Sequence, residues 1–136
     1  RLVKKWRTGP DEDYNNNPTW TIRRIAAPDE AFELVRGGMH DVVEDPDGTA
    51  LKARVPGVVI AGKTGSAQYS KLVNGEVVDS VYAWMISFAP FDSPRYAVAM
   101  MVEDGSSGGS AIGPRLSALY KDIFEYDGTL AKEAVQ

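Results

Sequence analysis

Apolar residues recur along the chain at two different spacings, which separate helical segments from extended ones. The helical spacing links four positions between residues 28 and 45, namely Phe32, Val35, Met39 and Val42. A proline opens this segment, where the first turn of a helix tolerates it, and the acidic residues that follow suit the positive end of the helix dipole. We therefore expect a helix over 28–45 with one face buried.

From residue 55 to residue 103 the pattern becomes that of strands. A β-branched, apolar run over 55–61 is typical of a buried strand and leads directly into Lys63. Large and small residues alternate over 81–91, a further strand follows over 95–103, and Asn74-Gly75 between them and the first run is a tight-turn signal. The sequence predicts a three-stranded antiparallel sheet over 55–103, with Lys63 at the end of its first strand and on the sheet edge.

The remaining segments complete the predicted order of elements. Residues 1–27 are interpreted as a strand over 1–7 and a turn-rich loop, followed by a short extended segment over 19–26. The glycine-serine stretch 105–109 is expected to be flexible, and apolar residues at helical spacing predict a helix over 110–126. Strand, helix, three antiparallel strands and helix together indicate an α+β fold in which helices cover the sheet.

The bulk composition narrows the classes of partner and site. The formal net charge is −4 and basic residues form no stripe, which argues against a nucleic-acid partner. The absence of cysteine excludes disulfides, thiolate metal sites and cysteine nucleophiles. No apolar run approaches the roughly 20 residues of a membrane span. Because the chain opens on Arg1 without a methionine or a signal peptide, we expect it to be a piece of a longer protein.

The segment from Gly57 to Thr64 matches the P-loop pattern G-x-x-x-x-G-K-[ST] letter for letter. A P-loop turns sharply through its four variable positions and starts a helix at the lysine, so that backbone N–H groups and the helix dipole face phosphates. Here those positions are Val, Val, Ile and Ala, which favour a strand, and no helical period follows Thr64. We therefore interpret the segment as a strand leading into Lys63 and not as a nucleotide site.

The same lysine begins a different motif, Lys63-Thr64-Gly65, which is the third signature of penicillin-binding proteins and serine β-lactamases. Its surroundings are AGKTGSAQ, then YAWMISFAP, then YAVAMMVEDG and a glycine-rich lead into the last helix. In order and spacing, these segments resemble the carboxy-terminal part of the transpeptidase domain of class B penicillin-binding proteins. The resemblance covers most of the chain from about Pro28 and implies part of the antiparallel sheet, flanked by helices, that this family shares with serine β-lactamases.

The resemblance implies a role for each residue of the motif. Lys63 offers a fixed cation to an anionic substrate and can tune a serine hydroxyl, so it is both a catalytic and a substrate-binding candidate. Thr64 and Ser66 offer hydroxyls to a carboxylate, where charge-assisted hydrogen bonds are strong. Gly65 leaves room for substrate along the strand, and the backbone N–H of Ser66 can face a developing oxyanion, which makes Ser66 the second catalytic candidate. No metal or cofactor is expected.

The other two motifs of the family are missing from the sequence. No serine is followed by lysine at the third position, and no Ser-x-Asn occurs. We therefore expect this chain alone to be inactive and to need the amino-terminal part of the same protein. By resemblance, the parent crosslinks peptidoglycan stem peptides by serine acyl transfer, binds β-lactams, is anchored at the periplasmic face of the inner membrane and associates with cell-wall synthesis proteins. The alternatives are a β-lactam-sensing or non-catalytic module, or a serine β-lactamase.

Five further residues invite a functional interpretation, and for each the simpler interpretation is preferred. His40 is expected to pack on its helix or lie at the surface, and Glu103-Asp104 to be a solvated strand end and not a metal site. Trp84 alternates with other residues along its strand and is expected in the core, not as a substrate platform. Tyr14, in a superficial Tyr-x-Asn, is given no catalytic role.

Overall fold

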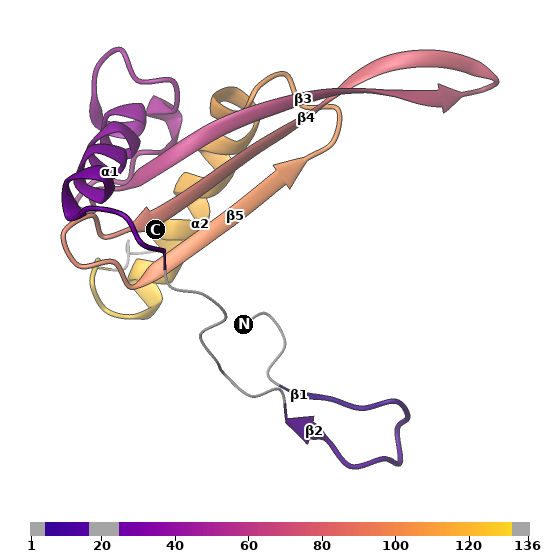
Figure 1. Ribbon diagram of the computed structural model, residues 1–136, viewed down its shortest axis with the longest axis horizontal. Coiled ribbons are helices and arrows are strands. Elements are labelled where there is room, and N and C mark those ends of the chain that lie inside the picture. The colour runs from indigo at the N-terminus through magenta and orange to yellow at the C-terminus, as the bar shows by residue number, and fades with distance from the viewer. Residues whose placement is uncertain (1–4, 17–24, 132–136) are drawn as a thin grey trace, which may run out of the picture.

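The computed structural model describes residues 5–16 and 25–131 (Figure 1). In chain order its elements are the strands β1 (Lys5–Trp6) and β2 (Asn15–Asn16), the helix α1 (Asp29–Glu44), the 3₁₀ turn η1 (Leu51–Ala53), the strands β3 (Ala61–Val73), β4 (Glu76–Ala89) and β5 (Tyr96–Val102), the π-helical turn η2 (Gly108–Ile112) and the helix α2 (Gly113–Tyr126). The fold is therefore α+β, as the sequence predicts.

Three antiparallel strands form the main sheet in the order β3-β4-β5. Thr64 of β3 lies opposite Met85 of β4, which lies opposite Met100 of β5. Because β3 pairs on one side only among the described residues, the strand that carries the Lys-Thr-Gly motif is an edge strand of this sheet. The two-residue strands β1 and β2 pair with each other, Lys5 opposite Asn16.

The hydrophobic core lies between one face of the sheet and the helices. Leu116, Tyr120 and Phe124 of α2 are fully buried there, together with Val43 of α1 and Met85 of β4. Figure 1 shows α2 crossing behind the strands, with α1 beside the beginning of β3. The Tyr120 hydroxyl lies 3.1 Å from the hydroxyl of the buried Ser87, so this polar pair inside the core is satisfied.

The apolar run 55–61 is not the strand that the sequence predicts. Val55 and Val58 form a single bridge around Gly57, whose φ of 84° closes a turn, and β3 begins only at Ala61. The side chains of Val55, Val58 and Ile60 nevertheless enter the core, which explains why the run is so apolar. Lys63 consequently lies near the start of a 13-residue strand and not at the end of one.

Burial along α1 also departs from the expectation of one continuous buried face. Val43 is fully buried, whereas Phe32 is 43% exposed and Val35 is 62% exposed. Only the second half of the helix therefore packs on the described part of the chain. Of the strand expected over 1–7, the described residues show Lys5–Trp6, and the extended segment expected over 19–26 lies mostly outside the described residues.

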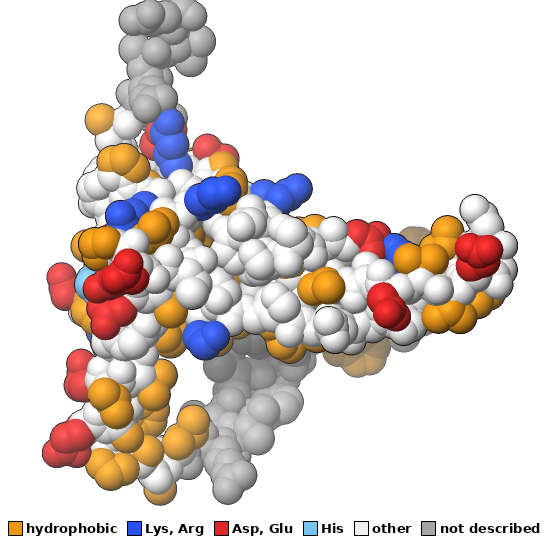
Figure 2. All heavy atoms as spheres, turned by 90° about the horizontal axis from the view of Figure 1, so that it is seen from above, with side chains coloured by type: hydrophobic (Ala, Val, Ile, Leu, Met, Phe, Trp, Pro, Cys, Tyr) orange, Lys and Arg blue, Asp and Glu red, His pale blue; other side chains and the backbone are white. Residues whose placement is uncertain are grey.

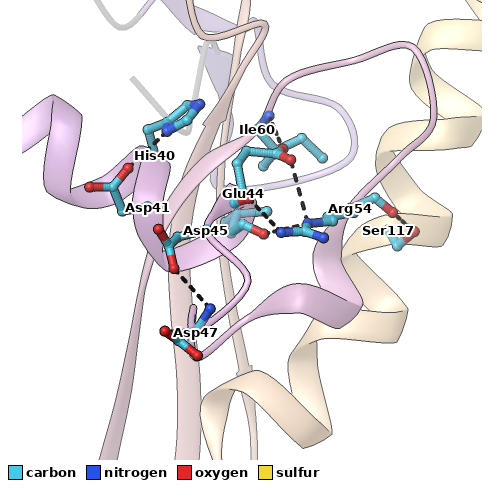
Figure 3. Close-up of polar contacts among 9 residues, drawn as sticks. His40, Asp41, Glu44, Asp45, Asp47, Arg54, Ile60 and Ser117 are labelled. Atoms are coloured by element: carbon cyan, nitrogen blue, oxygen red, sulfur yellow. Dashed lines mark hydrogen bonds and ion pairs between the residues drawn. The ribbon is translucent and has the colours of Figure 1, made fainter.

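A polar network fixes the turn that precedes β3 (Figure 3). The Arg54 Nε donates to the Val43 carbonyl at 2.8 Å and lies 3.5 Å from the Glu44 carboxylate. Glu44 in turn accepts the backbone N–H of Ile60 at 3.1 Å, and Ser117 of α2 donates to the Arg54 carbonyl at 2.7 Å. The end of α1, the turn before β3 and α2 are thus tied together directly upstream of the motif.

The hairpin of β3 and β4 extends well beyond the end of β5. Strand β5 pairs with β4 only as far as Ala83, so residues 76–82 of β4 pair with β3 alone. Figure 2 shows this arm projecting from the body, with apolar and acidic side chains near its tip. At its base Asp104 accepts hydrogen bonds from Lys71, Ser80 and Tyr69, which holds the arm against the end of β5.

Candidate functional site

The Lys-Thr-Gly motif is divided between the two faces of the sheet. Lys63 lies opposite Ile86, which is exposed, whereas Thr64 lies opposite Met85, which is buried. The face of the sheet that carries the exposed Ile86 is called the open face here, and α2 packs on the opposite face. Because side chains alternate along a strand, Lys63 and Gly65 belong to the open face, and Thr64 and Ser66 belong to the opposite one. The motif therefore offers a cation on one side of the edge strand and hydroxyls on the other.

A hollow of about 610 Å³ adjoins the motif and is lined by Lys63 to Ser66 together with residues of β4 and β5. Its apolar lining includes Trp84, Ile86 and Met101, which are 51%, 56% and 55% exposed. The structure thus brings together all four of the site residues that the sequence singles out, beside an apolar wall. Such a concave, mostly apolar surface with a few polar groups is typical of a ligand site.

Trp84 is not the core residue that the alternation of its strand suggests. Its indole is half exposed on the open face and lies directly over Gly65, the residue opposite it in the register. A Cβ on Gly65 would lie only 1.6 Å from the indole Nε1, so the glycine of the motif leaves room for this ring. The motif thus has a wall residue that sequence reasoning assigned elsewhere, and the cross-strand pairing with Gly65 is the feature that identifies it.

The ammonium group of Lys63 is available to a ligand. It donates to the carbonyl of the neighbouring Thr64 at 2.7 Å, and its side chain is exposed. Within residues 5–16 and 25–131, no carboxylate lies within ion-pair distance of it. Among the described residues, the Lys63 ammonium donates to this carbonyl alone, and such a cation beside an apolar hollow favours an anionic ligand.

The glycine-serine stretch after β5 is packed and not flexible as expected. Gly108 is buried, and a Cβ on it would lie 2.5 Å from the Trp84 carbonyl and 2.9 Å from the Thr64 Cβ. A Cβ on Gly109 would lie 1.9 Å from the Thr49 carbonyl. The glycines allow the backbone to approach closely, so this segment fills the space behind Thr64.

The other positions that the sequence singled out lie apart from the hollow. The ring centroids of His40 and Phe91 lie 5.0 Å apart, which confirms a packing role for this residue of α1. Asp104 is engaged by the hairpin, where hydrogen bonds from Lys71 and Ser80 hold its pKa below the usual range. The guanidinium carbon of Arg7 lies over the ring of Tyr14, 5.0 Å from the ring centroid. Among the described residues no group of three His, Cys, Asp or Glu could hold a metal ion.

The P-loop pattern is excluded by the structure that follows it. The residues after Lys63 continue as β3 through Val73, so no helix N-terminus faces the lysine. A phosphate cradle needs that helix and its dipole. The interpretation of Lys63 as part of a strand is confirmed, although the run before it is a turn.

The fold and the motif together define a class: an α+β domain with Lys-Thr-Gly on an edge strand, as in the serine acyl-transfer proteins that share this signature. The model of the penicillin-binding protein transpeptidase domain matches residues 1–125. The chain therefore belongs to the penicillin-binding protein transpeptidase domain family, and its relatives place it with the class B proteins.

Two relatives illustrate the similarity in sequence. The peptidoglycan D,D-transpeptidase MrdA of Acinetobacter baumannii is 33% identical over 128 residues, which are 88% of this chain and 17% of MrdA. The peptidoglycan D,D-transpeptidase PbpA of Mycobacterium tuberculosis is 42% identical over 113 residues, which are 81% of this chain and 21% of PbpA. The chain spans about a fifth of the length of these relatives.

Solved structures show the same likeness. The transpeptidase domain of penicillin-binding protein 3 from Burkholderia pseudomallei has a TM-score of 0.62 at 28% identity, covering 94% of this chain and 37% of that one. The complex between penicillin-binding protein PBP2 and MreC from Helicobacter pylori gives 0.60 at 32% identity, covering 74% of this chain and 18% of that one. These structures confirm the predicted fold class.

Proposed function

We propose that the parent protein crosslinks peptidoglycan stem peptides by serine acyl transfer and is acylated by β-lactams, and that this chain supplies the substrate-holding strand. The observation that carries the proposal is the position of Lys63, Thr64 and Gly65 on an edge strand beside an apolar hollow, in a member of the transpeptidase family. The sequence holds neither Ser-x-x-Lys nor Ser-x-Asn, so the nucleophile comes from another part of the parent.

Each residue of the motif has a role in this proposal. The exposed ammonium of Lys63 attracts the substrate carboxylate and favours the deprotonated form of a serine hydroxyl brought next to it. Thr64 donates its hydroxyl to the carboxylate, and the backbone N–H of Ser66 stabilises the oxyanion of the tetrahedral intermediate. Gly65 keeps the strand free of a side chain where Trp84 lies over it.

The open face of the sheet is where the amino-terminal part of the domain packs in this proposal. Trp84, Ile86 and Met101 expose half or more of their side chains there. Exposed apolar patches of this kind are typical of surfaces that another element covers. The same part would bring the nucleophilic serine to the rim of the hollow next to Lys63.

The relatives also support a setting for the parent. PBP2 of Helicobacter pylori has been solved together with MreC, and we propose that this parent likewise associates with cell-wall synthesis proteins. Its transpeptidase domain would lie on the periplasmic side of the inner membrane, anchored by a segment outside this chain. In the part of the chain that the structure describes, no helix is long and apolar enough to cross a membrane.

Acylation by a fluorescent penicillin tests the proposal. The parent should form a stable covalent adduct, and the 136-residue chain alone should form none. Lys63→Ala in the parent should lower the acylation rate roughly 10- to 100-fold, the range for loss of a hydrogen bond to a charged group. Lys52→Ala removes an exposed lysine that does not line the hollow and should react like the wild type. Labelling of the isolated chain, an unreactive parent, or rapid hydrolysis of the adduct as in a β-lactamase would contradict the proposal.

A further inference from the structure

Two threonine hydroxyls from different segments meet behind the Lys-Thr-Gly strand. The Oγ1 of Thr49 lies 3.2 Å from the Oγ1 of Thr64, across 15 residues of sequence. Thr64 belongs to the motif that lines the hollow, so this contact links the turn that holds Thr49 to the ligand-binding strand. The proposed function assigns no role to Thr49.

The backbone around Thr49 is held on two sides. The N–H of the next residue, Ala50, donates to the Val42 carbonyl of α1 at 2.8 Å. On the other side the Thr49 carbonyl is covered by Gly109, where a Cβ would approach to 1.9 Å. The turn is therefore clamped between the end of α1 and η2, and the Thr49 hydroxyl is presented to Thr64 from a rigid position.

The chemistry of the ligand sets the direction of this hydrogen bond. A hydroxyl has one proton to donate and accepts with its oxygen, whereas an ionised carboxylate only accepts. When Thr64 donates its proton to a ligand carboxylate, its bond with Thr49 can persist only if Thr49 is the donor. A donor at that point fixes the rotamer of Thr64 and strengthens its own donation, because successive hydrogen bonds polarise one another.

We propose that Thr49 is a positioning residue for carboxylate recognition: it donates to the Thr64 hydroxyl and thereby aims the Thr64 proton at the carboxylate of the bound ligand. This inference rests on the proposed function, because it takes a penicillin or stem-peptide carboxylate as the group that Thr64 contacts.

The test compares acylation of the parent protein by a penicillin with a free carboxylate and by the methyl ester of the same penicillin. Thr49→Val keeps the shape of the side chain but removes the donor. It should lower the second-order acylation rate of the acid by about three- to tenfold, the range for one neutral hydrogen bond. The loss should lie in the affinity of the complex that precedes acylation. The rate with the ester should not change, and Thr49→Ser should restore the rate with the acid.

Two further variants complete the design. Thr129→Val removes another hydroxyl that forms hydrogen bonds, with Asp127 and Arg95, and should leave both rates unchanged. Thr64→Val should likewise lower the rate with the acid and leave the rate with the ester unchanged. Adding Thr49→Val to Thr64→Val should lower the acid rate no further, because residues that act through one contact are not additive.

The outcomes separate this inference from the proposed function. A wild-type parent that does not react with penicillin overturns the proposed function, and the role of Thr49 falls with it. A reactive wild type whose Thr49→Val variant reacts equally fast with the acid overturns the role of Thr49 alone. A loss shared equally by acid and ester, or one accompanied by a lower melting temperature, shows that Thr49 only supports the fold and also overturns it.

Discussion

The close packing of Gly108 behind the motif leads to a sharp prediction for Gly108→Ala. The new Cβ would lie 2.5 Å from the Trp84 carbonyl, 2.9 Å from the Thr64 Cβ and 3.1 Å from the Gly65 backbone N. Two of these atoms are backbone atoms of paired strands, and the third is a Cβ fixed by its own backbone. None is the far end of a flexible side chain, so relief requires β3 and β4 to shift.

The expected cost follows from two opposing effects. Overpacking of this kind destabilises by about 1–3 kcal/mol, and contacts this short with backbone place Gly108→Ala near the upper end. The alanine also restricts the unfolded chain, which returns about 0.4–1 kcal/mol. The net loss of unfolding free energy is therefore about 2 kcal/mol, or about 4 °C in melting temperature at roughly 2 °C per kcal/mol, because the whole transpeptidase domain is larger than this chain.

Gly37→Ala is the matched control for this measurement. Nothing lies within 4 Å of the position that its Cβ would take, and Gly37 lies inside α1. Alanine in a helix interior is better than glycine by about 0.8–1 kcal/mol, so this variant should melt a few degrees higher. The two glycine-to-alanine changes should thus shift the melting temperature in opposite directions.

The assay is thermal unfolding of the parent's transpeptidase domain by circular dichroism, combined with acylation by a fluorescent penicillin. Gly108→Ala should lower both the melting temperature and the acylation rate, because the displaced atoms belong to Thr64 and Gly65 or to their partner strand. A Gly108→Ala variant that melts at or above the wild-type temperature and reacts at the wild-type rate would refute the packing argument.

Two other predictions concern the open face and the hairpin. Gly65→Ala should displace the half-exposed Trp84 indole and shift its fluorescence to longer wavelength. In a double-mutant cycle, Gly65→Ala should lower the unfolding free energy much less when Trp84→Ala is already present. An equal loss of unfolding free energy in both backgrounds would contradict this prediction. The pKa of Asp104 is lowered by hydrogen bonds, first from Lys71, so the ionised carboxylate stabilises the hairpin base above its ordinary pKa of 3.8, and this contribution is lost as pH falls through the lowered value. NMR shifts of the hairpin amides should titrate with a midpoint below pH 3.8. Asp104→Asn should abolish that titration, and asparagine tolerates the positive φ of 58° at this position. A midpoint at or above pH 3.8 would contradict the assignment.

Periodicity alone predicted the positions of both helices, although not which residues of α1 are buried. The helix expected over 28–45 runs from Asp29 to Glu44, and the last helix ends at Tyr126. The edge position of the motif also followed from its sequence context. The failures occurred where tertiary contacts decide: a positive φ at Gly57 turned a β-branched run into a bend, and close approach of Gly108 to β3 and β4 packed a stretch whose composition indicated flexibility.

The failure at Trp84 has a different cause, since the alternation itself was correct and the choice of face was not. Apart from Met85, the residues of β4 that face the core are small, namely Ala83, Ser87 and Ala89. They can be small because α2 fills that side with Tyr120 and Phe124. Bulk along a strand therefore does not identify the buried face when the covering helix supplies the large side chains.

The large apolar side chains of β4 that face away from the core then need an explanation of their own. A sheet face that meets water is normally polar, giving a strand that alternates between apolar and polar positions. Here Trp84 and Ile86 of β4 and Met101 of β5 line the open face, and Lys63 is the charged residue of the hollow beside them. Both faces of β4 thus carry apolar side chains, as in a strand buried on two sides. The proposed function accounts for this open face, because the amino-terminal part of the domain would cover the apolar side chains of β4 and β5 and bring the nucleophilic serine next to Lys63.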